Sequence, residues 1–182
     1  QDTIVNSEIQ LSAYDEMFKE SALKRNWDWR FLASIAYQES RYNPNARGFG
    51  GAYGMMQFMP NTGPSFGVYP ESPPEVQIDA GMRYIDKLFN SWKNIESREQ
   101  RLKFTLASYN AGKGHVEDAV RLAEKLGYNP TIWDENVELM IRLLSDPVYY
   151  RNPPVKYGAY RGPAKTYVKS IYSRYMLWRE NE

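Results

Sequence analysis

Hydrophobic residues recur at helical spacing along most of the chain, and the alternation typical of strands is nearly absent. The clearest stripe lies in residues 29–42, where apolar side chains share one helical face and Asp28 stands at the N-cap position. Pro44 disfavours helical angles at the residue before it, so this helix should end near Tyr42. A weaker stripe over residues 11–23 predicts an earlier helix.

Two capping patterns predict the next helices. Residues 72–75 (Ser-Pro-Pro-Glu) combine a hydroxyl cap with Pro and Glu in the first turn, and they lead into a stripe that ends at Trp92. Residues 97–100 (Ser-Arg-Glu-Gln) form a capping box ahead of a stripe that ends at Tyr109, and Gly residues break the helix just after it. Further helices are expected at 114–126, 131–145 and 164–179.

These elements predict an all-α fold with little or no β-structure. Two Gly- and Pro-rich segments, 43–54 and 61–74, predict irregular loops between helices. No internal repeat or low-complexity tract divides the chain. We therefore expect a single domain over residues 1–182, with a core from about residue 14 to residue 178.

Composition narrows the chemistry. The 182 residues include 23 Lys and Arg, 22 Asp and Glu, no Cys and a single His, His115. Without Cys, disulfide frameworks, thiolate nucleophiles and Cys-ligated zinc are excluded, and a single His argues against a multi-His metal site. We therefore expect no metal and no cofactor. The net charge of +1 argues against a nucleic-acid-binding protein.

Membrane and export signals are also missing from the sequence. No stretch approaches 18 apolar residues, so we expect no membrane span in this chain. Residues 1–5 lack the charged-then-apolar pattern of a signal peptide, which is typical of a mature form, an excised piece or a protein that is never exported. Aromatic content is 15%, and such side chains pack against sugar rings as well as in cores.

Glu39 is the polar residue least expected at its position. It follows Leu32 by seven positions and Ile35 by four, so on a helix it projects from the face that buries apolar side chains. Burial of a carboxyl should raise its pKa above the ~4.3 of a free Glu, which suits a general acid. In the structural alternative, Glu39 reaches water at the helix end or pairs with Arg41 or Arg47.

The segments that follow Glu39 favour the functional interpretation. Residues 48–54 are rich in Gly, which lets the backbone approach a ligand closely. Residues 55–59 (Met-Met-Gln-Phe-Met) surround one amide, Gln57, with apolar side chains, as in the wall of a binding pocket. The structural alternative for this stretch is a core helix with Gln57 exposed.

Three short motifs follow one another along the chain: Glu39-Ser40, residues 54–60 (Gly-Met-Met-Gln-Phe-Met-Pro) and residues 108–112 (Ser-Tyr-Asn-Ala-Gly). In this order they resemble the ES, G-L-M-Q-x-M-P and A/S-Y-N-A-G patterns of the lytic transglycosylase family (SLT, goose-lysozyme-like). The resemblance covers about residues 14–178. It implies a lysozyme-like helical fold.

The resemblance also implies a reaction. In that family the Glu of the ES motif, here Glu39, is the sole catalytic acid and base, and the bond cleaved is the β-1,4 bond from N-acetylmuramic acid to N-acetylglucosamine in peptidoglycan. Glu39 would protonate the glycosidic oxygen and then accept the proton of the muramic C6 hydroxyl, which closes a 1,6-anhydro ring. One carboxyl acting twice needs no partner Asp, unlike in two-carboxylate glycosidases. No other acidic residue lies between Glu39 and Glu71.

Five positions match residues that line the sugar subsites in the family: Gln57, Met59, Tyr109, Asn110 and Tyr167. Each also has a structural interpretation, such as a core Tyr or the last residue of a helix. Two departures put the subsite preference in doubt. Gly48 stands where many relatives carry a Ser that hydrogen-bonds substrate, and Pro163 stands where relatives commonly carry a Glu.

Other polar residues leave alternatives open. His115 fits a helix N-terminus or the surface better than a Ser–His–Asp site, because no Gly-x-Ser-x-Gly elbow accompanies it. Basic side chains near the C-terminus form either a solvated helix face or a surface that leans toward anionic cell-wall peptides. These residues are Arg161, Lys165, Lys169 and Arg174.

Two competing functions remain at this point: a lysozyme-like hydrolase, in which water attacks, and a non-catalytic peptidoglycan-binding module. The resemblance implies the glycan strands of peptidoglycan as the partner and the bacterial cell envelope, periplasmic or attached to the outer membrane, as the location. It also implies an upstream regulatory domain in the longer protein. We expect a monomer.

Overall fold

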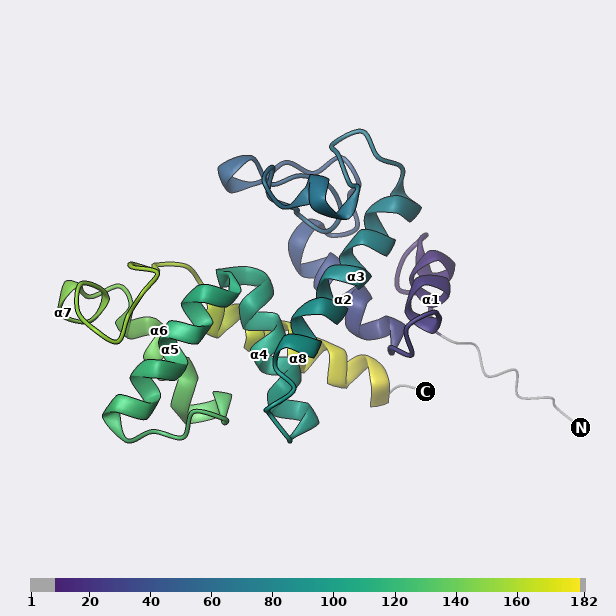
Figure 1. Cartoon of the computed structure of the whole chain (residues 1–182). Coiled ribbons are helices and arrows are strands. Elements are labelled where there is room, and N and C mark those ends of the chain that lie inside the picture. The colour runs from purple at the N-terminus through teal and green to yellow at the C-terminus, as the bar shows by residue number, and fades with distance from the viewer. Residues whose placement is uncertain (1–8, 181–182) are drawn as a thin grey trace, which may run out of the picture. The chain divides into compact units, whose positions relative to one another are not determined.

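The computed structural model describes residues 9–180, in which helices joined by irregular connections form the fold (Figure 1). No strand forms among these residues, where β-pairing is limited to the isolated bridges Arg47–Tyr53 and Tyr53–Phe58. The α-helices are α1 (Asp15–Leu23), α2 (Trp29–Ser40), α3 (Pro74–Ser91), α4 (Arg98–Ala111), α5 (Lys113–Leu126), α6 (Glu138–Leu143), α7 (Pro147–Tyr150) and α8 (Ala164–Glu180). Short turns of other helix types are η1 (Phe49–Gly51), η2 (Gly63–Phe66) and η3 (Trp133–Val137). The all-α prediction is therefore confirmed.

The chain divides into two compact units. The first unit contains the residues up to Tyr84 and those from Ile171 onward, and the second unit is Ile85–Ser170. Helices α3 and α8 contribute residues to both. The single domain expected from the sequence stays a prediction.

Aromatic packing around α2 forms the core of the first unit. Helix α1 packs against α2 (purple and violet in Figure 1), and Phe31 on α2 is buried between Trp27 and Tyr175, with ring centroids at 5.5 and 5.2 Å. Asp28 caps α2 as predicted, because its carboxylate accepts the backbone N–H of Arg30 at 3.1 Å. This capped and buried helix is the rigid element that carries Glu39.

Helix α3 begins at Pro74, within the predicted start at residues 72–75. Its apolar stripe is buried, with Ile78 and Met82 inaccessible to solvent. Ahead of it, the predicted loop over 61–74 contains the single turn η2. Phe66 from that turn packs on Tyr84 of α3 with ring centroids 5.0 Å apart, which ties the loop to the helix.

Helices α4, α5 and α6, teal to green in Figure 1, pack together in the second unit. Ser97 caps α4 as predicted, accepting the backbone N–H of Gln100 at 3.3 Å. Phe104 lies between Trp92 and Trp133, with ring centroids at 5.1 and 5.9 Å. These large buried rings form the centre of the unit's core.

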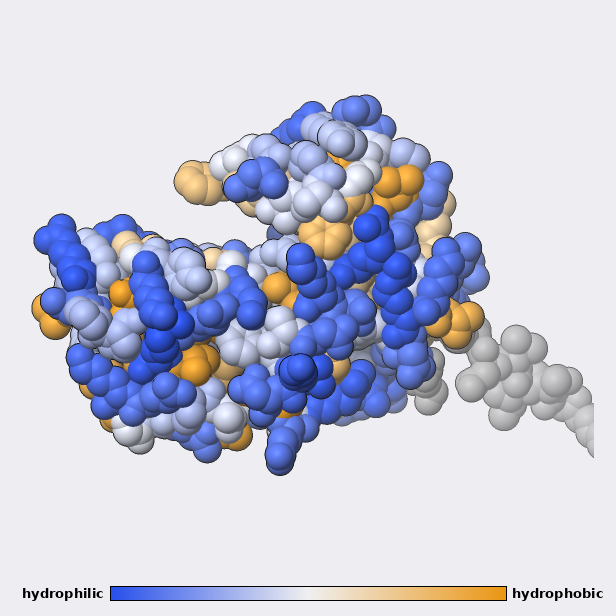
Figure 2. Space-filling view, in the orientation of Figure 1, coloured by the Kyte–Doolittle hydropathy of each residue, from blue (hydrophilic) through white to orange (hydrophobic). Residues whose placement is uncertain are grey.

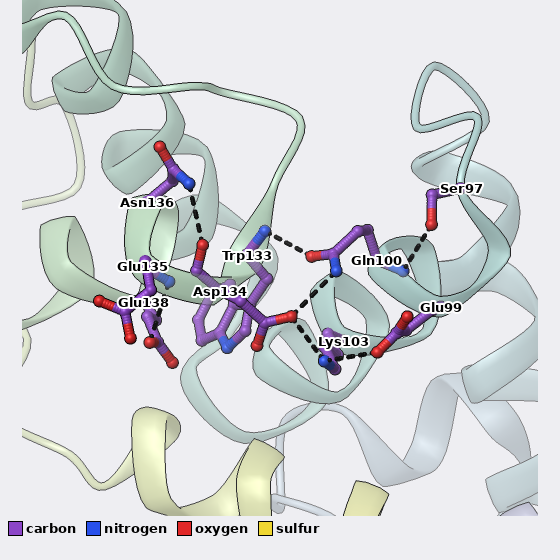
Figure 3. A network of polar contacts seen from close by, with 9 residues as sticks. All are labelled: Ser97, Glu99, Gln100, Lys103, Trp133, Asp134, Glu135, Asn136 and Glu138. Carbon is purple, nitrogen blue, oxygen red and sulfur yellow. Dashed lines mark hydrogen bonds and ion pairs between the residues drawn. The ribbon is translucent and has the colours of Figure 1, made fainter.

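The helix expected over 131–145 is wrong in its first half. Trp133–Val137 form the turn η3, in which Glu135 has a φ of 59°, and only Glu138–Leu143 are α-helical. Figure 3 shows the contacts of this turn: Oε1 of Gln100 accepts the backbone N–H of Trp133 at 2.7 Å, and Nε2 of Gln100 donates to the Asp134 carboxylate at 2.9 Å. This cross-connection holds the backbone out of the helical path.

Other boundaries differ by a few residues. Helix α2 ends at Ser40 rather than near Tyr42, because Arg41 and Tyr42 adopt left-handed angles with φ of 50° and 64°. In the first stripe, Leu23 is 81% exposed, so its spacing does not mark a core position. The connection before α8 contains the short helix α7, whose start is capped by Asp146.

The surface is polar over most of the face in view. Figure 2 shows hydrophilic side chains interrupted by small, separate hydrophobic patches. Over residues 9–180, no helix combines the length and the apolar character that crossing a bilayer requires.

Candidate functional site

Glu39 lies in the last turn of α2, next to the final helical residue Ser40. The helical face that leads to it is fully buried at Leu32, Ile35 and Ala36. Glu39 itself is partly exposed. Helical spacing therefore places this carboxyl at the rim of a buried face, where it is partly shielded from water and still reachable by a ligand. The raised pKa expected of its carboxyl stays a prediction.

Ser40 connects the Glu39 turn to the segment that carries the second motif. Its hydroxyl donates to the carbonyl oxygen of Met55 at 2.8 Å and also contacts that of Ala36 at 3.2 Å. The second contact lies within α2, whereas the first spans 15 residues. Ser40 therefore holds the 55–59 segment beside the end of α2.

The segment 55–59 is not the core helix of the structural alternative. Residues 55–57 lie within a turn that is closed by backbone hydrogen bonds exchanged between Tyr53 and Phe58 at 3.0 and 3.1 Å. Met55 and Met56 are fully buried, whereas Met59 is 41% exposed. The segment therefore has an anchored first half and an accessible end, as expected of a pocket wall.

The side chain of Gln57 hydrogen-bonds the backbone on either side of the Gly-rich loop. Its side-chain Nε2 donates to the carbonyl oxygens of Gly54 at 2.8 Å and Ala46 at 3.3 Å. A Cβ atom added at Gly48 would lie 2.1 Å from Oε1 of Gln57. The carboxamide thus fills the space that a side chain at position 48 would occupy, which gives a physical reason for the Gly at this departure from the family pattern.

Gln77 is a positioning residue that the sequence analysis missed. This buried α3 side chain accepts the backbone N–H of Met55 at 2.7 Å and donates to the carbonyl oxygens of Ser72 at 2.7 Å and Pro44 at 3.1 Å. One amide therefore fixes three separate segments around the second motif. The available signal was a polar residue directly beside the apolar stripe of a helix.

Gly81, one turn after Gln77 on α3, lets the same segment approach closely. A Cβ atom at Gly81 would lie 2.8 Å from two side-chain atoms of Met56. Gln77 and Gly81 thus form a receiving face for residues 55 and 56, one by hydrogen bonding and the other by its lack of a side chain.

In the second unit, Asn110 lies near the C-terminal end of α4 and is held by a tyrosine far along the chain. The hydroxyl of Tyr160 donates to Oδ1 of Asn110 at 2.9 Å and accepts the backbone N–H of Ala164, the first residue of α8, at 3.1 Å. Burial raises the pKa of Tyr160 to about 12, against a smaller opposing effect of the Ala164 N–H, so this hydroxyl stays protonated and able to donate at neutral pH. Tyr160 thus links the third motif to the start of α8.

Tyr109 and Tyr167 lie on the two helices that Tyr160 connects. Tyr109 is partly exposed near the end of α4, and Tyr167 is buried in the first turns of α8. Ser108, the residue before Tyr109, is buried and accepts the indole N–H of Trp92 at 2.8 Å. Ser108 therefore has a structural role in the motif.

His115 lies in the first turn of α5, as the structural interpretation predicted. Its ring packs near that of Tyr160 with centroids 5.3 Å apart, and its buried Nδ1 makes no hydrogen bond to the described residues. Burial lowers the pKa of His115, and the charge of Asp118 opposes this effect only in part. The imidazole is therefore neutral at neutral pH and packs as an aromatic ring.

Asp118 anchors the connection that leads to Tyr160. It is fully buried, and its carboxylate accepts the backbone N–H groups of Lys156 and Tyr157, both at 2.8 Å. Arg121 pairs with the same carboxylate. This paired charge fixes the chain some 40 residues downstream, and these two distant backbone partners could not be read from the local sequence.

The six predicted site residues form two groups, one in each unit. In the first unit, Ser40 and the Gly-rich loop hold the site residues near one another. In the second unit, Tyr160 connects the two helices that carry the site residues. The first group is Glu39, Gln57 and Met59, and the second is Tyr109, Asn110 and Tyr167. Over residues 9–180, no group of three or more His, Asp or Glu side chains is arranged to hold a metal ion.

Comparisons with known proteins place these motifs in context. Residues 16–132 match the family model described as the transglycosylase SLT domain. The chain is 37% identical over 175 residues to the membrane-bound lytic murein transglycosylase F of Aeromonas salmonicida, covering 94% of this chain and 34% of that protein. The relative of the same name from Shewanella loihica is 39% identical over 176 residues, covering 95% and 36%. The chain thus spans about a third of the length of these curated relatives.

Solved structures show the same fold. An inactive mutant of the lytic transglycosylase Slt from Pseudomonas aeruginosa superposes with a TM-score of 0.59 at 20% identity, covering 92% of this chain and 24% of that one. The 70 kDa soluble lytic transglycosylase of Escherichia coli gives 0.57 at 23% identity, with the same two coverages. The lysozyme-like helical fold expected from the sequence is confirmed.

Proposed function

Because the chain belongs to the transglycosylase SLT domain family, we propose that it is a peptidoglycan lytic transglycosylase, with Glu39 as its single acid and base. The observation that carries this proposal is the placement of Glu39. It lies at the rim of the buried face of α2, and Ser40 joins its turn to the segment of the second motif at 2.8 Å. The substrate is the β-1,4-linked glycan of peptidoglycan.

In the first step, the Glu39 carboxyl donates its proton to the oxygen of the glycosidic bond. The bond between that oxygen and C1 of N-acetylmuramic acid breaks, and the leaving N-acetylglucosamine keeps the proton. The N-acetyl group of the substrate stabilises the positive charge that develops at C1. A general acid in such a role contributes typically 10²–10⁴-fold to the rate.

In the second step, Glu39 acts as a base. Its carboxylate takes the proton of the muramic C6 hydroxyl while O6 forms a bond to C1. The 1,6-anhydro ring closes, and Glu39 returns to its protonated form. No water is consumed, so the masses of the two products sum to that of the substrate.

The remaining site residues bind and orient the sugars. Asn110 is pre-oriented by Tyr160, and its amide nitrogen can donate to a sugar hydroxyl. Met59 offers an exposed thioether side chain at the end of an anchored segment, suited to the apolar face of a sugar ring. Gln57, Tyr109 and Tyr167 complete the set.

The proposal is tested by mass spectrometry of the products from purified peptidoglycan. The wild-type chain should release muropeptides that end in 1,6-anhydro-muramic acid, and Glu39→Gln should release at least 10²-fold less. Glu124→Gln, the same change at an exposed glutamate of α5, is the matched control and should behave as wild type.

Other products would replace the proposal. Reducing-end muropeptides one water heavier would identify a hydrolase. Binding to peptidoglycan without any product would identify a non-catalytic module. Full activity in Glu39→Gln would remove Glu39 from the mechanism.

We place the activity in the bacterial cell envelope, where peptidoglycan lies. Two relatives are membrane-bound lytic murein transglycosylases by name, which supports this location. Fractionation of cells that express the full-length protein would test it, with recovery in the cytoplasm as the contrary result.

A further inference from the structure

An open cavity of about 500 Å³ in the second unit is lined by three cationic side chains. Arg142 is at the end of α6, Arg161 in the connection before α8, and Lys165 in the first turn of α8. The hydroxyl residues Ser145 and Thr166 also line the cavity. None of the described residues in its wall is acidic.

These three cations lack the carboxylate partners that other cations of the chain have. None of them forms an ion pair among the described residues, whereas Lys113, Arg121 and other basic residues do. Arg161 makes only an aromatic contact, with its guanidinium 5.6 Å from the ring centre of Tyr150. Charges of one sign gathered around a cavity raise its affinity for anions.

The start of α8 strengthens this field. Lys165 lies in the first turn of a 17-residue helix, the end where the helix dipole disfavours a cation. An anion in the cavity would face both the cationic side chains and the positive end of the helix. Both the side-chain charges and the helix dipole therefore favour an anion in the cavity.

The cavity also borders a residue of the candidate site. Tyr160 lines it, and the hydroxyl of Tyr160 donates to Asn110 at 2.9 Å. A polymer that contacts Asn110 brings its side branches near the cavity. In peptidoglycan these branches are peptides that carry free carboxylates, and Arg pairs well with carboxylates through two parallel hydrogen bonds.

We propose that this cavity binds a carboxylate of the peptide stem attached to the glycan strand. The assignment rests on the proposed function for the choice of ligand, and on the cavity's own charges for the choice of an anion. It makes Arg142, Arg161 and Lys165 determinants of preference for peptide-bearing over bare glycan.

The test compares two substrates with the whole chain. Peptide-bearing glycan strands and the same strands stripped of peptide by an amidase are digested by the wild-type chain and by the triple variant Arg142→Gln, Arg161→Gln, Lys165→Gln. The wild type should have a lower KM for peptide-bearing strands than for bare strands. The KM for bare strands divided by the KM for peptide-bearing strands should fall about tenfold in the triple variant, which corresponds to a loss of about 1.4 kcal/mol in the preference for peptide. Lys169→Gln, an exposed α8 position outside the cavity, should keep the wild-type ratio.

Binding of a free peptide gives a second readout. An isolated stem peptide should bind the wild type more weakly as salt is raised, and it should bind less well when its carboxylates are amidated. If the triple variant does not fold, the single variant Arg161→Gln, at an exposed position, replaces it and should also bind the peptide less tightly than the wild type.

Three results would overturn the assignment. These are an unchanged KM ratio in folded variants, equal binding of the amidated peptide, or binding of inorganic phosphate as tight as that of the peptide, which would indicate a general anion site. Absence of cleavage of both substrates by the wild type would instead count against the proposed function, and peptide binding would still decide the role of the cavity.

Discussion

At the scale of single residues, buried amides and carboxylates position the site. Gln77 hydrogen-bonds three backbone groups that lie 22, 5 and 33 residues away. A buried side-chain amide of this kind stabilises the fold, because the buried N–H and C=O groups that it binds would otherwise have no hydrogen-bond partner.

Gln77→Ala should therefore lower the free energy of unfolding by about 3 kcal/mol, because it leaves the N–H of Met55 and two carbonyl groups without their partner. Chemical denaturation measures the loss. Gln10→Ala, at an exposed amide, is the control and should change stability by less than about 0.5 kcal/mol. Equal effects of the two substitutions would contradict the positioning role.

His115 makes stability depend on pH. Burial lowers its pKa below the ordinary 6.5, with Asp118 opposing in part. The unfolded state then binds the proton more readily, so the contribution of His115 to stability is present above pH 6.5 and is lost as pH falls through its folded-state pKa.

Urea denaturation between pH 7 and pH 5 measures this effect. The wild type should lose stability toward pH 5, and His115→Gln should lose less over the same range. Parallel pH curves for the two proteins would show that His115 titrates alike in the folded and unfolded chains.

Some of these residues could be found in the sequence. Glu39 stands out because helical periodicity depends only on neighbours three, four and seven positions away. Gln77, Asp118 and Tyr160 could not be found in this way, since their partners lie up to 50 residues distant and only the folded chain brings them together.

At the scale of elements, caps and stripes predicted most helices. Asp28 and Ser97 cap the helices that follow them, as expected. The prediction fails over 133–137, where the side chain of Gln100 bonds to η3 instead of closing the capping box of α4. Local propensity cannot anticipate such a contact.

Asp134 holds this irregular turn to α4. Lys103 donates to its carboxylate at 2.6 Å, and Gln100 donates to the same oxygen. Burial alone would raise the pKa of Asp134, but these two hydrogen bonds and the Lys103 charge outweigh it and hold the pKa below 3.8. The contribution of this carboxylate to stability is therefore present above pH 3.8 and is lost on further acidification.

Asp134→Ala should lower the free energy of unfolding by about 1–2 kcal/mol and speed amide hydrogen exchange in residues 133–143. The loss of stability caused by Asp134→Ala should be smaller in a Lys103→Met background. That background has no buried Lys103 ammonium that could lose its Asp134 partner. The double-mutant cycle at neutral pH measures the coupling. Identical losses in both backgrounds would contradict the ion-pair account.

At the scale of the whole molecule, motif order predicted the family and the fold. Three motifs within residues 39–112 were enough to indicate the family, because each has defined residue types at fixed spacing and they occur in the family's order. The division into two compact units was not predicted, since the first unit combines residues up to Tyr84 with residues from Ile171 onward, and no local pattern marks these boundaries.

Ligand binding should stabilise the chain as a whole. In Glu39→Gln, which retains the proposed sugar-binding residues, glycan at about 100 times its Kd should add about 2.7 kcal/mol and raise Tm by roughly 5–10 °C. Thermal unfolding with and without purified glycan strands measures the shift. An unrelated polysaccharide such as dextran should give none, and an equal shift with dextran would refute specific recognition.

The packing of Gln57 against Gly48 constrains how this loop can evolve. A Ser introduced at position 48 would displace the Gln57 carboxamide, whose Oε1 lies where the new Cβ must go, and would break its bonds to Gly54 and Ala46. The two positions are therefore epistatic. A hydroxyl at position 48 therefore requires the flexible Gln57 side chain to take another rotamer, so the effect of a substitution at either position depends on the residue at the other.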